Sequence, residues 1–273
     1  MVIGIDLGSR NVKIIQMREG RIMQRAVFDT IQFYRKFARM QQSFASGTNN
    51  AATGGTETDL GSPSMLNLDF KQLGFSDDRI VATGYGKIAV QVQGAIQIPE
   101  IQAHVAGAVF QSMLGDFTLL DIGGQDTKVV QVRGGRAVDF LTNDRCAASS
   151  GRYVENMAAV LGMSLEELSS CQHEPVELNS TCAIFGETEI IAKIVEGHPL
   201  GHLAAGINYA LYRRVASMLK KLKSEMILLS GGVAFNSALM AIIAHESRCE
   251  VRRLPEPQLN GAIGCCIYGD KED

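Results

Sequence analysis

The chain has 273 residues, of which 46% are hydrophobic and 6% aromatic, and its formal net charge is −3. That length allows one large domain or two lobes of ordinary size, and the small charge gives no reason to expect nucleic-acid or membrane binding. We find no basic-plus-apolar leader and no apolar run near the roughly 20 residues of a membrane span, so we expect a cytoplasmic protein. The six cysteines are irregularly spaced, which favours metal binding or catalysis over a disulfide framework.

The beginning of the chain predicts a three-stranded meander followed by a short helix over 30–40. Residues 41–65 differ, because Gln, Ser, Asn, Gly and Thr dominate and few side chains there could be buried. We interpret them as an exposed, flexible insertion. The strands of the meander are expected at 2–6, 12–18 and 21–28.

Later segments alternate short apolar strands with longer amphipathic stretches. A second meander, from 117 to 141, repeats the pattern of the first. The other expected elements are strands at 80–83 and 226–229, and helices over 101–114, from Ala147, after Cys182, over 200–223 and from Asn260.

The first turn of the second meander, Asp121-Ile122-Gly123-Gly124, joins an apolar strand to a β-branched one. Glycines let backbone N–H groups approach phosphate oxygens, and an aspartate beside them can hold Mg²⁺ directly or through water. Taken alone, the turn is also compatible with an ordinary Gly-Gly hairpin.

The same pattern opens the chain, which indicates an internal duplication. A single shift brings one set of residues onto the other: Asp6, Gly8, Lys13, Gln16, Arg18, Gly20 and Arg21 fall on Asp121, Gly123, Lys128, Gln131, Arg133, Gly135 and Arg136. Two similar lobes facing each other across a cleft would each offer one phosphate-binding hairpin. That arrangement resembles the actin, sugar-kinase and Hsp70 class of ATPases.

A third glycine element, Ser230-Gly231-Gly232-Val233, follows a buried strand and precedes a helix start. Backbone can approach a nucleotide there, and a helix N-terminus favours its phosphates. One Gly-Gly pair is weak evidence for a nucleotide site. This pair, however, follows two expected phosphate hairpins, and the resembled class of ATPases contacts adenosine at that position.

Two cysteines, Cys146 and Cys182, share one context, because each follows a candidate helix cap and lies in the expected first turn. A helix N-terminus lowers the pKa of a thiol and stabilises the metal-binding thiolate; two small buried cysteines are the alternative. A [4Fe–4S] cluster takes four thiolates, so a two-fold dimer would supply two from each chain.

At this point the chain resembles a specific family, the BadF/BadG/BcrA/BcrD ATPases, which include the activators of 2-hydroxyacyl-CoA dehydratases. The resemblance covers nearly the whole chain except about 30–75. The motifs that carry it are Asn143-Asp144-Arg145-Cys146-Ala147-Ala148, Ser180-Thr181-Cys182, Ala82-Thr83-Gly84-Tyr85-Gly86, Asp121-Ile122-Gly123-Gly124-Gln125-Asp126 and Asn260-Gly261-Ala262.

The resemblance implies an α/β, duplicated actin/sugar-kinase/Hsp70-like fold with two lobes around a nucleotide cleft. Lobe I would span 1–114, lobe II 115–255, and a C-terminal helix, 256–273, would pack back on lobe I. It implies ATP, Mg²⁺ and one [4Fe–4S] cluster shared by a homodimer. ATP hydrolysis would drive single-electron transfer from ferredoxin or flavodoxin to an iron–sulfur dehydratase or reductase, of the 2-hydroxyacyl-CoA dehydratase, benzoyl-CoA reductase or double-cubane-cluster type.

The expected site residues fall into three groups. Asp6, Asp121, Glu100 and Gln125 are the catalytic candidates, with Asp6 and Asp121 organising Mg²⁺ and Glu100 positioning water. The nucleotide contacts are Gly8, Ser9, Arg10, Lys13, Gly123, Gly124, Gly231, Gly232 and Val233. Cys146 and Cys182 are the cluster ligands.

Two departures from the family pattern stand out. Arg10 follows Ser9 where the family usually has threonine, and Ser149-Ser150 replaces Gly-Thr after the first cluster cysteine. His104 matches a family position or is an interior histidine. A small-molecule kinase of the same fold without a cluster, and a nucleotide sensor without turnover, are the rival functions.

Overall fold

The structure is a computed structural model that describes residues 1–37, 64–66, 68–76, 78–84, 90–143, 150–180 and 183–270. Most of the predicted insertion at 41–65 lies outside these ranges, as do Cys146 and Cys182. Within them, no helix combines the length and apolarity needed to cross a bilayer.

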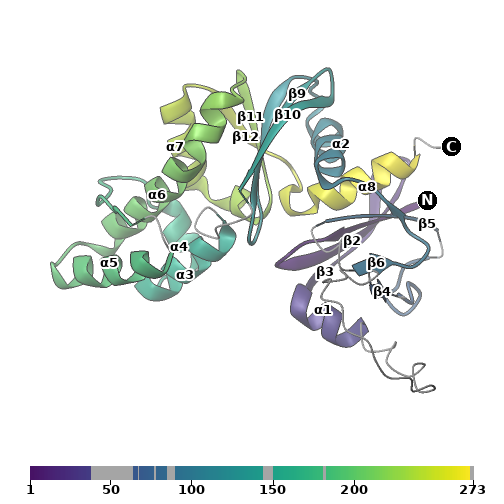
Figure 1. Ribbon diagram of the computed structural model, residues 1–273, viewed down its shortest axis with the longest axis horizontal. Helices are drawn as coiled ribbons and strands as arrows, with labels where there is room; N and C mark the ends of the chain where they lie inside the picture. The colour runs from purple at the N-terminus through teal and green to yellow at the C-terminus, as the bar shows by residue number, and fades with distance from the viewer. Residues whose placement is uncertain are drawn as a thin grey trace, which may run out of the picture.

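Two five-stranded sheets with the same topology form the framework of the molecule (Figure 1). In each, the central strand pairs antiparallel with the strand that follows it and parallel with a strand from much later in the chain. This repeat confirms the predicted duplicated α/β fold. The first sheet has the order β3-β2-β1-β5-β7, with β1 Val2–Leu7, β2 Asn11–Arg18, β3 Arg21–Asp29, β5 Arg79–Thr83 and β7 Ile96–Gln97. The second has the order β10-β9-β8-β11-β12, with β8 Phe117–Ile122, β9 Thr127–Arg133, β10 Arg136–Asn143, β11 Met226–Ser230 and β12 Glu250–Arg253.

Burial explains why β1 and β8 are central. All six residues of each are buried, as expected for strands covered on both faces. The edge strands β3 and β10 have many exposed positions. A small parallel pair, β4 Ser64–Leu66 and β6 Val90–Val92, stands beside the first sheet.

Helices cover the sheets and connect them. Helices α2 and α8 pack closely on each other, and α8 also packs on β1 and β5. The contact is close because Gly264 has no side chain: a Cβ there would lie 1.7 Å from the carbonyl oxygen of Ala103. The helices are α1 Thr30–Phe37, α2 Glu100–Ser112, α3 Gly151–Leu161, α4 Leu165–Ser170, α5 Ala183–Val195, α6 Leu200–Lys221, α7 Ser237–Ser247 and α8 Asn260–Asp270, with 3₁₀ turns at Gly232–Phe235 (η4) and Pro257–Leu259 (η5).

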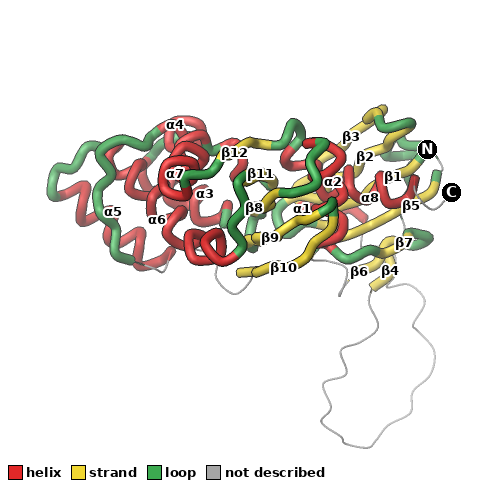
Figure 2. Tube along the Cα trace, turned by 90° about the horizontal axis from the view of Figure 1, so that it is seen from above, coloured by secondary structure: helices red, strands yellow, loops and turns green. Residues whose placement is uncertain are grey.

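The molecule is elongated, with α5 towards one end and the N-terminal sheet at the other (Figure 2). One core cluster joins β8 to α3, α6 and α7, and another joins β1 to α2 and α8. The site described below lies between these two units.

The main difference from the predicted elements is the start of α3. Its N-cap is Ser150, in extended backbone, and its first residue is Gly151, later than the expected start near Ala147. The backbone N–H groups of Gly151 and Arg152 donate to the carbonyl oxygens of Gly123 and Gly124, at 2.8 and 3.1 Å. A distant turn therefore satisfies the helix N-terminus and sets where it begins.

Candidate functional site

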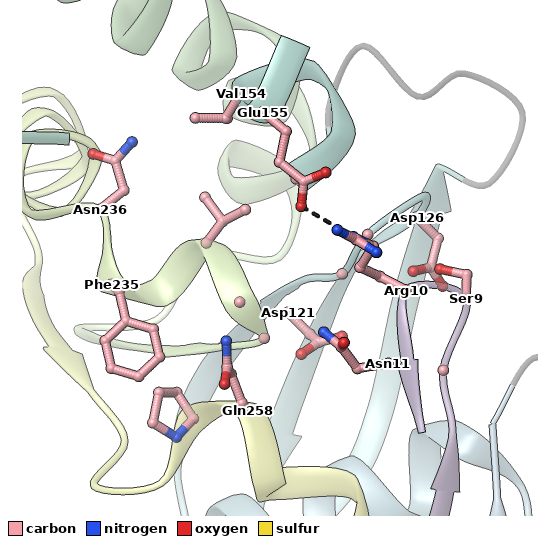
Figure 3. Close-up of a pocket in the computed structure, with 18 of the residues that line it drawn as sticks. Ser9, Arg10, Asn11, Asp121, Asp126, Val154, Glu155, Phe235, Asn236 and Gln258 are labelled. Carbon is pink, nitrogen blue, oxygen red and sulfur yellow. Dashed lines mark hydrogen bonds and ion pairs between the residues drawn. The ribbon is translucent and has the colours of Figure 1, made fainter. Parts of the chain in front are cut away.

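A cavity of about 630 Å³ lies between the two halves of the molecule (Figure 3). Its walls are the β1–β2 turn, the β8–β9 turn, α3, α4, and the residues around η4 and η5. Its size suits a nucleotide-sized ligand. Of the predicted site residues, it brings together Asp6, Gly8, Ser9, Arg10, Lys13, Glu100, Asp121, Gly123, Gly124, Gly231, Gly232 and Val233.

The two strand turns meet directly across this cavity. A Cβ on Gly124, in the second turn, would lie 2.5 Å from the Cβ of Arg10 in the first. Thr30 stabilises the first turn, because its hydroxyl donates to the carbonyl oxygen of Gly8 at 2.7 Å. Exposed backbone from both turns can therefore face one anion.

Each turn is flanked by a buried aspartate on one strand and a lysine on the next, and the two residues lie opposite each other in the strand pairing. Asp6 lies opposite Lys13 across β1 and β2, and their Oδ2 and Nζ atoms are 3.0 Å apart. Asp121 lies opposite Lys128 across β8 and β9, with Oδ2 and Nζ 3.9 Å apart. The duplication seen in the sequence is therefore also a duplication of charge positions.

The second lysine differs from the first in its neighbours. The Nζ of Lys128 is 3.0 Å from Oε1 of Glu100 and pairs closely with Asp126. Burial works against the charged amine, but Asp121, Glu100 and Asp126 outweigh it and hold the pKa of Lys128 well above its usual range. Lys128 is thus a permanent cation among three carboxylates.

Asp121 is the most constrained acid of the site. Ser230 Oγ donates to its Oδ1 at 2.6 Å, and Nδ1 of His104 lies 3.4 Å from the same oxygen without hydrogen-bond alignment. Burial disfavours the carboxylate, but His104, Lys128 and the Ser230 hydroxyl together hold the pKa of Asp121 well below its usual range. Asp121 is therefore ionised at any physiological pH.

The residues present fit a magnesium ion that keeps much of its own water. Asp6 and Asp121 are both 3% exposed and line the same cavity, and carboxylate oxygens are the ligands that Mg²⁺ prefers. Within the described ranges, no three His, Cys, Asp or Glu side chains are grouped as a metal site. Water and nucleotide phosphates would supply the remaining ligands.

Glu100 and Gln125, the other predicted catalytic residues, have different surroundings. Glu100 lines the cavity and is within ion-pair distance of Lys128 and His104. Gln125 is exposed and is not among the cavity-lining residues. Its neighbour Asp126, which the sequence analysis did not select, lines the cavity instead.

The third glycine element forms the opposite wall of the cavity. Gly231 has φ +82°, and a Cβ there would lie 2.2 Å from the carbonyl oxygen of Ile122, so only glycine suits this position. Phe235, Asn236 and Gln258 lie beyond it (Figure 3). These residues could not be predicted from the sequence, because they are not themselves part of a phosphate or metal motif.

Two of the described cysteines belong to the hydrophobic core, and two are partly exposed. Cys265 and Cys266 are fully buried on α8, and burial raises the pKa of the Cys266 thiol to about 12, so neither thiol is reactive. Cys171 and Cys249 are half-buried and hydrogen-bond to backbone carbonyls. The two predicted cluster ligands, Cys146 and Cys182, lie outside the described ranges.

The raised pKa of His104 predicts that the stability of the protein depends on pH. Burial alone would lower its pKa, but Asp121, Asp6 and Glu100 raise it from 6.5 to about 8. Because the folded-state pKa is the higher one, the stabilisation is complete below about pH 6.5 and is lost as the pH rises through about 8. We expect the free energy of unfolding, measured with urea, to fall by about 2 kcal/mol as the pH rises across this window.

The variant His104→Gln should remove that dependence, while His245→Gln, at an exposed histidine of α7, should retain it. A wild-type protein whose unfolding free energy is flat from pH 6 to 9 would contradict the assignment.

Comparisons with known proteins agree with this geometry. The model of the BadF/BadG/BcrA/BcrD ATPase family matches residues 3–269. The chain is 30% identical to the 2-hydroxyisocaproyl-CoA dehydratase activator of Clostridioides difficile over 98% of this chain and 94% of that protein. It is 30% identical to the (R)-2-hydroxyglutaryl-CoA dehydratase activating ATPase of Acidaminococcus fermentans over 99% of this chain and 97% of that protein.

A solved structure of the activator of the 2-hydroxyisocaproyl-CoA dehydratase from Clostridium difficile, with bound ADPNP, superposes with a TM-score of 0.79 and 27% identity. That superposition covers 99% of this chain and 94% of the other. The duplicated sheets, the facing turns and the family model thus support the same assignment. The chain belongs to the BadF/BadG/BcrA/BcrD ATPase family.

Proposed function

We propose that this protein is an ATP-hydrolysing activator that drives low-potential single-electron transfer to a partner iron–sulfur enzyme. It would act as a homodimer that shares one [4Fe–4S] cluster between Cys146 and Cys182 of each chain. The partner would be a 2-hydroxyacyl-CoA dehydratase or a related reductase, and the electron donor a ferredoxin or flavodoxin. The dehydratase-activating roles named for the two curated relatives support this proposal.

One observation carries the proposal most directly, namely the hydrogen bonds between the second phosphate turn and α3. The carbonyl oxygens of Gly123 and Gly124 accept from the first two N–H groups of α3. The segment that precedes α3 in the chain contains Cys146. A change at the turn caused by nucleotide binding or hydrolysis would therefore act on the first residues of α3, which follow that segment in the chain.

The segment before Cys182 is tied to the same helix. Arg214 of α6 donates through Nη2 to the carbonyl oxygen of Ser180 at 3.1 Å, and its guanidinium lies 4.2 Å from the centre of the Tyr153 ring on α3. Helices α3 and α5 also pack on each other. The described residues that flank the two cysteines in the chain thus belong to one packed unit, which suits a pair of thiolates acting together.

A dimer would account for the apolar surface of α5. This helix begins directly after Cys182 and exposes Phe185, Ile191 and Val195 to solvent. Large apolar side chains that cluster on one exposed helix are typical of an interface. A cluster bound by two thiolates from each chain requires a partner on this side of the molecule.

In this proposal, ATP binds with its phosphates between the two strand turns and with Mg²⁺ beside Asp6 and Asp121. Asp6 and Asp121 would hold Mg²⁺, which would supply positive charge beside the phosphates, and Glu100 would position the attacking water. Closing the cleft would rotate one half of the molecule against the other. When bound, the cluster would supply the one-electron carrier.

The test is iron and acid-labile sulfide content, together with the mass in solution, of anaerobically purified protein. We expect about four irons per dimer, lost in both Cys146→Ser and Cys182→Ser and kept in the control Cys249→Ser. Wild-type protein that stays iron-free after anaerobic reconstitution would overturn the electron-transfer function and leave a kinase of the same fold.

A further inference from the structure

Arg10 connects the two halves of the molecule across the mouth of the cavity. Its Nη1 lies 2.5 Å from Oδ2 of Asp29, at the end of β3. Its Nε lies 3.3 Å from Oε1 of Glu155 on α3 (Figure 3). The guanidinium thus joins the first phosphate turn to the helix that the second phosphate turn caps.

The two carboxylates are held very differently. Oδ1 of Asp29 accepts the backbone N–H of Gln32 at the start of α1, at 3.0 Å, so Asp29 is fixed to the same sheet as Arg10. Glu155 has Arg10 as its one ion-pair partner among the described residues. Of the two carboxylates, Glu155 is therefore the one that a bound anion would replace as a partner of Arg10.

The cavity places this pair where the phosphates would lie. Arg10 and Glu155 both line it, together with Gly8, Ser9, Gly123 and Gly124. The Cβ of Arg10 packs against Gly124, so the side chain starts from the point where the two turns meet. Within the described ranges, no residue accepts a hydrogen bond from Nη2 of Arg10, which leaves that nitrogen able to donate to a phosphate.

A phosphate at this point cannot leave the Arg10–Glu155 pair unchanged. The terminal phosphate of ATP has more negative charge than a carboxylate and can form bidentate, charge-assisted bonds with a guanidinium. It would also repel the nearby carboxylate of Glu155. ADP lacks that phosphate and would leave the pair intact.

We propose that Arg10 senses the terminal phosphate of ATP by exchanging Glu155 for it. ATP releases α3 from the first phosphate turn, and loss of the terminal phosphate restores the ion pair and draws α3 back. This inference rests on the proposed function only in that the cavity binds ATP. It assigns the side chain that distinguishes the substrate from the product.

The experiment is calorimetric titration of a non-hydrolysable ATP analogue and of ADP, each with MgCl₂, into wild-type protein, Arg10→Gln, Glu155→Gln and the double variant. Arg10→Gln should weaken binding of the analogue about 10-fold relative to ADP, since it removes a charge-assisted phosphate contact. Glu155→Gln should strengthen analogue binding several-fold and leave ADP binding unchanged. In the double variant most of that gain should disappear.

Arg25→Ala is the matched control, because Arg25 also forms a long-range ion pair, 3.0 Å from Glu256, but does not line the cavity. It should bind both nucleotides as wild type does. Equal weakening of both nucleotides by Arg10→Gln, or unchanged or weaker analogue binding by Glu155→Gln, would overturn the exchange. Wild-type protein that binds neither nucleotide would instead refute the proposed function itself.

Discussion

The variant Asp121→Asn is expected to lower the rate of ATP hydrolysis on the order of 100-fold or more. Asp121 is buried and ionised, and it faces the cavity beside the glycines of the second turn. Asparagine keeps the shape and can still accept from Ser230, but it lacks the charge that would hold Mg²⁺ in the proposed function. The loss should therefore appear in kcat more than in the affinity for ATP.

The measurement is steady-state phosphate release at saturating ATP, with circular dichroism to show that the variant is folded. Asp139→Asn is the control, because Asp139 is an exposed aspartate in the same sheet and its loss should leave the rate unchanged. A folded Asp121→Asn protein that retains most of the wild-type rate would remove Asp121 from the catalytic site.

Replacing Lys128 by methionine should cost the protein about 3–5 kcal/mol of unfolding free energy at pH 7. The lysine is nearly completely buried and faces Glu100, Asp121 and Asp126. Methionine fills similar space but leaves three carboxylates without their shared cation. The penalty should shrink as the pH falls, because protonation of a carboxylate relieves the repulsion.

Urea unfolding at pH 5 and at pH 7 would measure this. The control is Lys193→Met on α5, which removes an exposed ion pair with Glu196 and should not change stability measurably. A loss of less than about 1 kcal/mol for Lys128→Met at pH 7 would mean that the carboxylates do not depend on this lysine.

The duplicated fold could be predicted because its signals are local. A strand, a glycine turn and a second strand occur within a dozen residues, and the two copies keep the same residue types at the same spacing. The structure confirms this as equal strand orders and equal registers, with Asp6 opposite Lys13 and Asp121 opposite Lys128.

Residues that act together across the cavity could not be found in this way. His104 and Glu100 lie on α2, and only the packing of α2 against the second sheet brings them to Asp121 and Lys128. Glu155 is one of several glutamates in the sequence, and nothing near it predicts its contact with Arg10. Gln125, which follows the two glycines of the second turn, is exposed and does not line the cavity.

The sequence by itself therefore determined the family, the two glycine turns of the duplicated sheets and the third glycine element, because these depend on backbone conformation and on spacing within short segments. Only the tertiary structure decided which charges face each other, where α3 begins and how Arg10 joins the two halves. Those features depend on contacts between residues far apart in the chain. Such contacts form only when the sheets and helices have packed, and no local periodicity encodes them.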